Sequence, residues 1–172
     1  MILALAFILI FALLLFIALL FSFMVFDLFL ELPYVATQRK KIETIIKFAN
    51  IKKGETVVDL GSGDGRLLIE SAKRGAVATG YEINPFMIAI SMIHRKLEGF
   101  ENQIEIRKES LWKADLAVAD VVFVYAKRIS MKKFEDFIYK NSKKGTRIVV
   151  NTNPFPNKKA ENEENRIFLF KF

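Results

Sequence analysis

The hydrophobic pattern divides the chain into two unequal parts. Met1 to Phe26 contains no charged residue and a single hydroxyl, that of Ser22. As a helix, this segment would span roughly 39 Å, which exceeds the ~30 Å hydrocarbon core of a bilayer. It lacks the basic n-region and the small-residue cleavage site that a signal peptide needs. The pattern therefore predicts one tilted transmembrane helix over residues 1–26.

Beyond Phe26, short apolar runs alternate with amphipathic segments. Strands are predicted at 56–60, 77–81, 120–125 and 146–150, and at 103–108, where apolar and polar residues alternate. The amphipathic segments predict helices, at 37–50, 65–74, 85–98 and 129–140. Strands that alternate with helices in this way indicate an α/β domain with a doubly wound, mostly parallel sheet.

The last apolar run, Arg166 to Phe172, breaks this alternation. Fifteen residues separate it from the preceding strand, and they contain Pro154 and Pro156 followed by a strongly polar stretch. A helical crossover is not expected there, so we predict that the last strand is antiparallel to its neighbour. The charged stretch Lys158–Asn165 is predicted to be a solvated loop.

The pattern as a whole predicts an anchor at 1–26, a juxtamembrane linker at 27–36 and one domain at 37–172. Roughly 140 residues suit a single compact domain. Every Lys and Arg lies after Phe26. The positive-inside rule then places the domain of this single-pass protein on the cytoplasmic, or equivalent inner, side of its membrane. We expect a monomer.

Composition excludes several kinds of site. The chain has no cysteine and a single histidine, His94, so disulfides, thiolate metal sites, multi-histidine metal sites and a cysteine nucleophile are ruled out. We expect no metal. His94 itself is interpreted as a surface or packing residue in preference to a catalytic base.

The net charge of the chain indicates which partners the domain can bind. After Asp27 the chain carries 26 basic and 18 acidic residues, a formal charge of +8. Nucleic acid could neutralise this charge, but the predicted anchor makes an anionic bilayer surface the simpler partner. Arg39, Lys40 and Lys41 follow the linker and either contact lipid headgroups or form a solvated face. A nucleic-acid partner is not expected.

The candidate chemistry begins in the stretch Val57–Gly65. A buried strand that carries Asp59 runs into a loop of alternating glycines, Gly61, Ser62, Gly63, Asp64 and Gly65. Glycines at this position let a ligand approach the backbone closely. The P-loop pattern is absent. A dinucleotide fingerprint needs a third glycine where Arg66 stands, and that side chain would obstruct close helix–strand packing.

The remaining pattern is Asp-x-Gly-x-Gly-x-Gly with Glu82 seventeen residues after Gly65. A carboxylate beside the loop suits a ligand's ammonium group, and Glu82 at the end of the second strand can accept hydrogen bonds from ribose hydroxyls. The combination resembles class I S-adenosylmethionine-dependent methyltransferases. That resemblance implies a Rossmann-like methyltransferase sheet and S-adenosylmethionine as the cofactor.

A closer resemblance emerges when more of the chain is compared, from about Leu32 to Phe172. The segments that carry it are Pro33-Tyr34-Val35, Val58–Arg66, Gly80–Pro85, Leu111-Trp112-Lys113 and Pro154-Phe155-Pro156. In this order they are similar to the membrane-anchored protein-lysine methyltransferases of the ATP synthase c-subunit and the adenine nucleotide translocase. The N-terminal hydrophobic anchor is also a feature of that family.

The resemblance implies a set of cofactor-binding residues. They are Thr37, at the methionine end, then Asp59, Gly61, Ser62, Gly63, Gly65, Glu82 and Asn84, and finally Glu109 and Ser110, near the adenine. The family typically has Asp just before the Leu-Trp pair. Here that position is Ser110, with Glu109 one residue earlier, and Ser110 can still accept a hydrogen bond.

Candidate acceptor-site residues follow the fourth and fifth strands. A lysine amine must lose its proton before it can accept a methyl group, so a partly apolar pocket that lowers its pKa from ≈ 10.4 would help. Tyr125, Asn153 and Phe155 are the candidate walls, because sites of this architecture form at the carboxyl ends of strands. Asn153-Pro154-Phe155 can equally be a plain turn.

Three functions stay open. The first is methyl transfer to a lysine of a protein substrate at the membrane. The second is transfer to RNA or a nucleobase, because amino-methyltransferases carry Asn/Asp-Pro-Pro-Tyr/Phe, although they carry it after the fourth strand. The third is a membrane-tethered module that binds the cofactor without catalysis.

Overall fold

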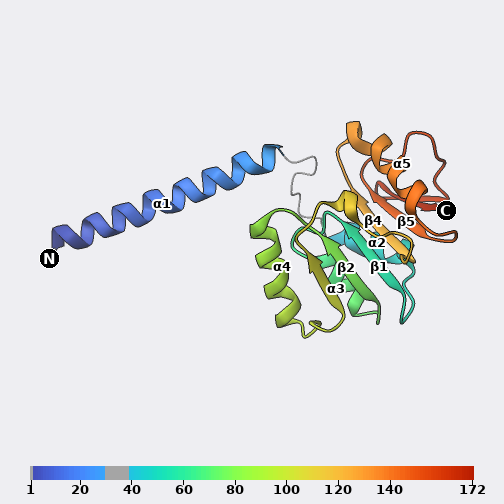
Figure 1. Cartoon of the computed structure of the whole chain (residues 1–172), viewed down its shortest axis with the longest axis horizontal. Coiled ribbons are helices and arrows are strands. Elements are labelled where there is room, and N and C mark those ends of the chain that lie inside the picture. The colour runs from blue at the N-terminus through green and yellow to red at the C-terminus, as the bar shows by residue number, and fades with distance from the viewer. Residues whose placement is uncertain (1, 30–38) are drawn as a thin grey trace. The chain divides into compact units, whose positions relative to one another are not determined.

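The computed structural model describes residues 2–29 and 39–172 (Figure 1). Two compact units divide the chain, Met1–Tyr34 and Val35–Phe172. Thr37, a predicted cofactor contact, and the segment Pro33-Tyr34-Val35 lie outside the described residues.

The first unit contains one long helix, α1, from Ile2 to Phe29. Its segment Leu3–Ser22 has a mean hydropathy of 3.3, and none of that segment is buried. By length and composition α1 can cross a bilayer, a test that signal sequences also pass. The helix extends three residues beyond the predicted anchor, through residues 27–29.

The second unit is an α/β domain whose elements alternate as predicted. In chain order they are α2 (Arg39–Ala49), β1 (Thr56–Leu60), α3 (Arg66–Ala72), β2 (Val77–Tyr81), α4 (Pro85–Leu97), β3 (Ile104–Arg107), η1 (Leu111–Lys113), β4 (Val121–Tyr125), η2 (Arg128–Ser130), α5 (Met131–Asn141), β5 (Arg147–Asn151), β6 (Asn162–Glu164) and β7 (Ile167–Lys171).

The strands form one seven-stranded sheet in the order β3-β2-β1-β4-β5-β7-β6. Strands β1 to β5 pair in parallel, with Leu60 of β1 opposite Tyr81 of β2. Strand β7 is antiparallel to β5, which confirms the prediction for the last apolar run. The carboxyl ends of β1 to β5 therefore share one edge of the sheet.

The prediction of a solvated loop over Lys158–Asn165 was wrong in part. Residues Asn162–Glu164 form the edge strand β6, antiparallel to β7. A two-residue turn joins them, with positive φ at Asn165 (54°) and Arg166 (60°), as a type I′ hairpin requires. All three β6 side chains are exposed, so the strand shows no apolar alternation in the sequence.

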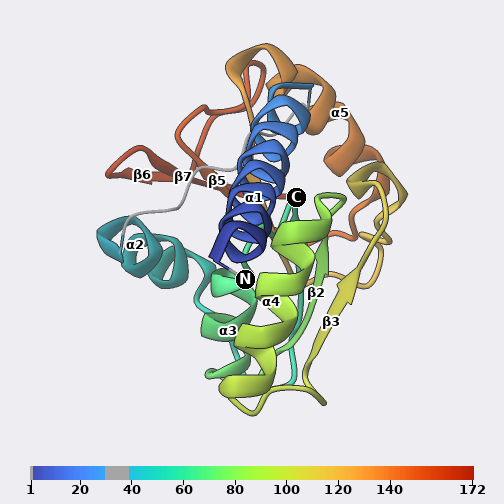
Figure 2. The same ribbon diagram turned by 90° about the vertical axis from the view of Figure 1, so that its left-hand side faces the viewer.

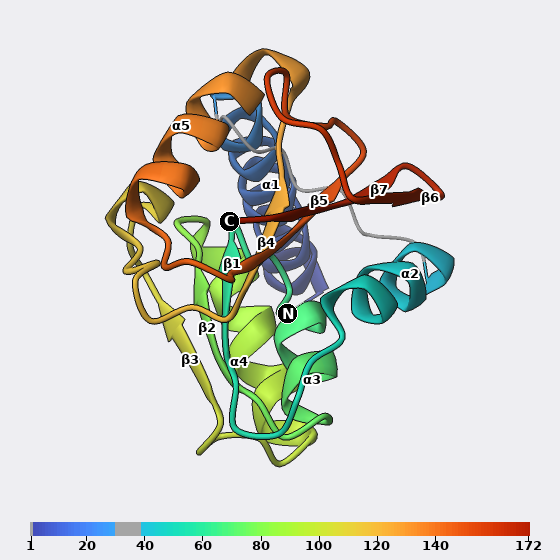
Figure 3. The ribbon, with the colours of Figure 1, turned by 90° about the vertical axis from the view of Figure 1, so that its right-hand side faces the viewer.

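Helices cover both faces of the sheet. Figures 2 and 3 show α2, α3 and α4 on one face and α5 on the other. On the first face Ile45 and Leu68 pack against Val57 and Val121. On the second, α5 buries Phe134 and Ile138 completely. The ring centroid of Phe134 lies 4.7 Å from that of Trp112.

Truncating Phe134 tests the α5 side of the core. The substitution Phe134→Ala is expected to lower the free energy of unfolding by about 3–5 kcal/mol, because it leaves a cavity at a fully buried site. Urea unfolding can be followed by the fluorescence of Trp112, the single tryptophan. Asp136→Ala on the exposed side of α5 is the matched control and should change stability by about 1 kcal/mol or less, since it breaks only a surface ion pair with Lys132. Equal losses in the two variants would contradict the assignment of Phe134 to the core.

Candidate functional site

The glycine loop that follows β1 is pinned to the end of β2. The backbone N–H groups of Gly61 and Ser62 both donate to the carbonyl oxygen of Tyr81, at 3.0 and 3.1 Å. Gly63 and Gly65 have φ values of 54° and 80°, a region that other residues rarely adopt. Gly65 also lies against Ser91 of α4, where a Cβ would clash. The loop thus presents bare backbone at the carboxyl edge of the sheet.

Glu82 joins the two segments that form this edge. Its Oε2 accepts a hydrogen bond from the N–H of Gly63 at 2.9 Å. Its Oε1 accepts from the N–H groups of Ile83 and Asn84, each at 2.8 Å. The side chain is half-buried, so the carboxylate stays accessible while backbone donors fix its orientation.

Asp59 lies in β1 directly before the loop and is 5% exposed. Burial raises the pKa of its carboxyl to about 8, and the negative charges of Glu82 and Asp64 contribute to that rise. Its carboxylate accepts no hydrogen bond from another residue in the described part of the chain. A buried carboxylate in this situation favours a cationic partner, because a nearby positive charge compensates its lost solvation.

The side chain of Arg66 is paired with Asp64 of the glycine loop. Its Nε donates to both carboxylate oxygens of Asp64, at 2.9 and 3.0 Å, and its guanidinium forms an ion pair with the same group. The Nδ1 atom of His94 lies 3.0 Å from the Asp64 carbonyl oxygen, which gives His94 a packing role beside the loop.

Gly80 in β2 provides the close approach that a third loop glycine provides in dinucleotide sites. A Cβ at Gly80 would lie 2.5 Å from Ser62 Oγ and 2.6 Å from Leu68 Cδ1. The sequence reasoning missed this residue. A glycine inside the strand, between Thr79 and Tyr81, was the available signal, since it often marks close backbone approach.

Two of the predicted cofactor contacts have buried side chains. Asn84 is 1% exposed, and its Oδ1 caps α4 by accepting from the N–H groups of Phe86 (3.0 Å) and Met87 (3.4 Å). Ser62 is 6% exposed. Within the described residues, Asn84 Nδ2 and Ser62 Oγ have no hydrogen-bond partner. Asn84 therefore positions the start of α4, and its amide N–H donors remain unused.

Glu109 and Ser110 follow β3 at the same edge of the sheet. The N–H of Glu82 donates to the carbonyl of Arg107 at 3.1 Å, which places this connection next to Glu82. Glu109 is exposed and Ser110 is half-exposed. Trp112, two residues later, is held by the rings of Phe134 and Phe137.

The structure brings together two of the three predicted acceptor-site residues. Tyr125 ends β4, half-exposed, opposite Asn151 of β5. Asn153 Nδ2 donates to the carbonyl of Ala126 at 2.8 Å and so ties the turn after β5 to the end of β4. Phe155 is 3% exposed and packs against the rings of Tyr139 and Phe170, so its side chain points into the core.

Lys41 is a residue of this edge that the sequence reasoning assigned elsewhere. We expected it at a lipid surface or on a solvated face, but its Nζ donates to Thr152 Oγ1 (2.9 Å) and Asn151 Oδ1 (3.2 Å). Partial burial lowers the pKa of Lys41, and the positive charge of Arg166 adds to the effect. Lys41 thus holds the end of β5, where Thr152 has a positive φ of 75°.

A family model described as the ANTKMT methyltransferase domain matches residues 59–162, which include the loop, Glu82 and the turn after β5. The chain belongs to this family. No group of three or more His, Cys, Asp or Glu in the described part of the methyltransferase chain is arranged to hold a metal ion.

Curated relatives of the methyltransferase domain are named as lysine methyltransferases. The ATP synthase c-subunit lysine N-methyltransferase of Homo sapiens is 31% identical over 125 residues, 73% of this chain and 53% of that protein. Adenine nucleotide translocase lysine N-methyltransferase of Mus musculus is 30% identical over 128 residues, 74% and 56% of the two chains. A protein-lysine N-methyltransferase of Saccharolobus islandicus is 31% identical over 121 residues, 69% and 75% of the two chains. The chain spans about half the length of the first two relatives.

Solved structures share the fold. An RNA methyltransferase from Salinibacter ruber, in complex with S-adenosyl-L-homocysteine, superposes with a TM-score of 0.76 at 24% identity, covering 80% of this chain and 93% of that one. The C-terminal domain of precorrin-6Y C5,15-methyltransferase from Rhodobacter capsulatus gives 0.62 at 20% identity, covering 68% and 64%.

Family and fold together imply S-adenosylmethionine as the cofactor, and the residues at the strand edge fit it. Asp59 is a buried carboxylate suited to an ammonium group, and Glu82 is an oriented carboxylate suited to ribose hydroxyls. Gly61 and Gly63 supply backbone without side chains next to them, with φ values of 91° and 54°.

Removing the Glu82 carboxylate should weaken cofactor binding. Glu82→Ala is expected to reduce S-adenosylmethionine affinity about 10- to 100-fold, because it removes the carboxylate suited to the ribose, which also holds the N–H of Gly63. Isothermal titration measures the change. Glu105→Ala, in the neighbouring strand, removes an exposed carboxylate paired with Arg107 and should leave the affinity within about twofold. An unchanged affinity in Glu82→Ala would rule out this site.

Asp59 should give stability a characteristic pH dependence. Its pKa is raised to about 8 by folding, so its contribution to stability is fully present below about pH 4 and is lost as the pH rises toward 8. Asp59→Asn is therefore expected to gain stability relative to the parent protein, by a margin that grows from pH 5 to pH 8. Denaturant unfolding of the cofactor-free protein at several pH values measures the margin.

The control for this titration has the opposite sign. Burial raises the pKa of Asp120, but its bonds to Lys143 and to the Thr56 N–H outweigh burial and leave that pKa lowered. Asp120→Asn should therefore lose stability at neutral pH, and the loss should fade as the pH falls through the lowered pKa. If the difference in the free energy of unfolding between Asp59→Asn and the parent protein were the same at every pH, folding would not raise the pKa of Asp59.

Proposed function

We propose that this chain transfers a methyl group from S-adenosylmethionine to the ε-amine of a lysine in a membrane-associated protein. The observation that carries the proposal is the match of one family model across the whole strand edge, from Asp59 through Glu82 to the turn after β5. The acceptor class comes from the relatives, which are named for lysines of the ATP synthase c-subunit, of the adenine nucleotide translocase and of proteins in general.

Under this proposal the cofactor contacts lie on the β1–β2 side of the edge. When bound, S-adenosylmethionine supplies an activated methyl group on its sulfonium sulfur. Asp59 holds the ammonium group, Glu82 the ribose, and Gly61 and Gly63 leave space for the backbone of the ligand. We propose that Ser110 and Glu109, after β3, contact the adenine, and that Thr37 contacts the methionine end, as the family resemblance implies.

The acceptor lysine would enter on the β4–β5 side. Tyr125 ends β4, and Asn153, after β5, donates a hydrogen bond to the carbonyl of the next residue, Ala126, which ties the two sides of this wall together. Phe155 supports the wall from the core side. A lysine held against an aromatic ring and away from water has a lowered pKa, so a larger share of it is neutral and able to react. Positioning then supplies most of the rate enhancement.

The membrane part of the proposal rests on α1. A helix with a mean hydropathy of 3.3 over Leu3–Ser22 inserts favourably into a bilayer. Because all Lys and Arg residues follow α1's apolar core, the domain would stay on the cytoplasmic or equivalent inner side. We further propose that the protein acts as a monomer.

Transfer to a nucleobase is the weaker candidate. In the structure the Asn153 amide donates its N–H to the Ala126 carbonyl, so the side chain is engaged with the protein backbone. The corresponding position after β4 is occupied by Tyr125, Ala126 and Lys127, which lack an amide side chain.

Methyl-labelled cofactor distinguishes the candidates. The full chain in detergent, incubated with labelled S-adenosylmethionine and native membranes, is expected to place label on lysine of a membrane protein, detected by hydrolysis and amino-acid analysis. Glu82→Ala should lose this transfer and Glu105→Ala should keep it. Label on RNA would instead support a nucleobase acceptor, and cofactor binding without any label would support a non-catalytic module.

A further inference from the structure

Helix α4 turns apolar side chains toward solvent. Met87 and Ser91 are its buried residues, whereas Ile90, Ile93 and Leu97 are 37%, 57% and 79% exposed. At 3.6 residues per turn these three lie within an arc of roughly 60° on one side of the helix. We call this row the α4 face.

The pattern is the reverse of an ordinary surface helix. Helices α2 and α5 bury their apolar residues, as surface helices do. On the inner side of α4, by contrast, Ser91 is buried and the Arg95 guanidinium donates to the Ile104 carbonyl at 2.9 Å. An exposed row of large aliphatic side chains on a folded domain indicates a surface that another apolar phase covers.

The ionisable side chains of helix α4 itself are all basic. Helix α4 contains no acidic residue and ends with His94, Arg95 and Lys96, of which Lys96 is exposed beside the face. The carboxylate that follows the helix, that of Glu98, is paired with Lys73 at 3.2 Å. This arrangement, aliphatic with flanking cations, suits the interface of an anionic bilayer.

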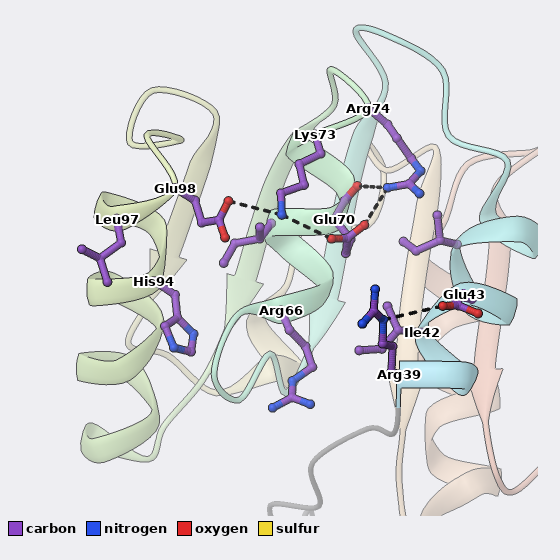
Figure 4. Close-up of a pocket in the computed structure, with 12 residues that line it drawn as sticks. Arg39, Ile42, Glu43, Arg66, Glu70, Lys73, Arg74, His94, Leu97 and Glu98 are labelled. Atoms are coloured by element: carbon purple, nitrogen blue, oxygen red, sulfur yellow. Dashed lines mark hydrogen bonds and ion pairs between the residues drawn. The ribbon is translucent and has the colours of Figure 1, made fainter.

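A cavity of about 430 Å³ connects α4 to the start of α2. Leu97 and His94 line it from α4, and Arg39 lines it from α2. Figure 4 shows Arg39 and Arg66 at one end of the cavity, with the Glu70 ion pairs to Lys73 and Arg74 at the other. Arg39 and the adjacent Lys40 are exposed in the first turn of α2, where Arg39 is paired with Glu43 at 3.8 Å and Lys40 adds a further cation.

The chain also limits how far this surface can lie from a bilayer. Helix α1 ends at Phe29 and α2 begins at Arg39. Ten residue steps span at most about 35 Å when fully extended. If α1 crosses a membrane, the first turn of α2 cannot leave the membrane surface by more than this distance, so lipid is always within reach of the domain.

We propose that the α4 face docks on the surface of the bilayer that α1 anchors, with Ile90, Ile93 and Leu97 among the acyl chains and Lys96, Arg39 and Lys40 at anionic headgroups. The proposal rests on the anchoring of α1 in the proposed function and adds an orientation to it. Helix α4 begins directly after Glu82 and Asn84, so docking this helix would also fix the direction in which the strand edge opens.

The absence of cysteine allows a direct test on the full chain. Single cysteines at Ile93→Cys and Leu97→Cys would carry a nitroxide spin label, in vesicles of phosphatidylcholine with phosphatidylglycerol. Val118→Cys is the matched control, because Val118 is 51% exposed and lies outside α4. Leu14→Cys within α1 reports anchoring separately. Depth is read from the relative collision rates with oxygen and with a water-soluble nickel complex.

Labels at Ile93 and Leu97 are expected about 5–10 Å below the phosphate level, the depth of an interfacial helix, while the Val118 label stays in water. Aqueous labels at Ile93 and Leu97 with a lipid-buried Leu14 label would overturn docking and leave anchoring intact. The converse result would support docking and overturn anchoring. Dipolar broadening between chains at Ile93 would overturn the proposal in favour of a second copy on this face. Equal depth in pure phosphatidylcholine vesicles would overturn the role of anionic headgroups.

Discussion

The arrangement at the carboxyl ends of the parallel strands depends on one carboxylate, that of Glu82. Glu82 accepts three backbone hydrogen bonds, one from the loop after β1 and two from the turn that begins α4. Hydrogen bonds to a charged group are about twice as strong as neutral ones, so these bonds hold two chain segments in register without a covalent link. The same bonds leave the carboxylate oriented and partly exposed. A residue that builds the loop is therefore also the one best placed to hold a ligand against it.

Asp59 shows that this arrangement is unfavourable for a buried negative charge when no ligand is bound. The carboxylate lies within a cluster that also contains Glu82 and Asp64, and Asp64 is compensated by Arg66 whereas Asp59 has no such partner among the described residues. A pKa of about 8 means that the cofactor-free protein keeps this group largely protonated at neutral pH. A bound ammonium group would reverse that preference. The site is thus preorganised in shape by Glu82 but completed in charge only by its ligand.

Much of the fold could be predicted from the sequence because local patterns and tertiary structure agree. Strands β1 and β2 have the predicted bounds, and the spacing from Gly65 to Glu82 correctly indicated that both lie at one edge. The errors arise where a side chain's partner is distant in sequence. The side chain of Lys41 donates hydrogen bonds to Asn151 and Thr152, which lie 110 and 111 positions further along the chain. Strand β6 forms by pairing with β7. Neither leaves a periodic signal. Phe155 and Asn84 were predicted as site residues from their positions in motifs. Whether such a residue faces a ligand or the core depends on tertiary packing, which the spacing of a motif does not specify.

The exposed α4 face can be explained only when the sequence and the structure are considered together. In the sequence, Ile90, Ile93 and Leu97 have the spacing of a helix that packs inward. The structure shows the row outside, with Ser91 and Arg95 on the sheet side. A domain in bulk water gains nothing from this inversion, and solubility opposes it. The inversion becomes favourable only if the surroundings of α4 are themselves apolar, which is the condition that an anchored helix α1 would create. The same lipid phase would then account for the exposed apolar residues of α1 and of the α4 face, the first spanning it and the second lying on it.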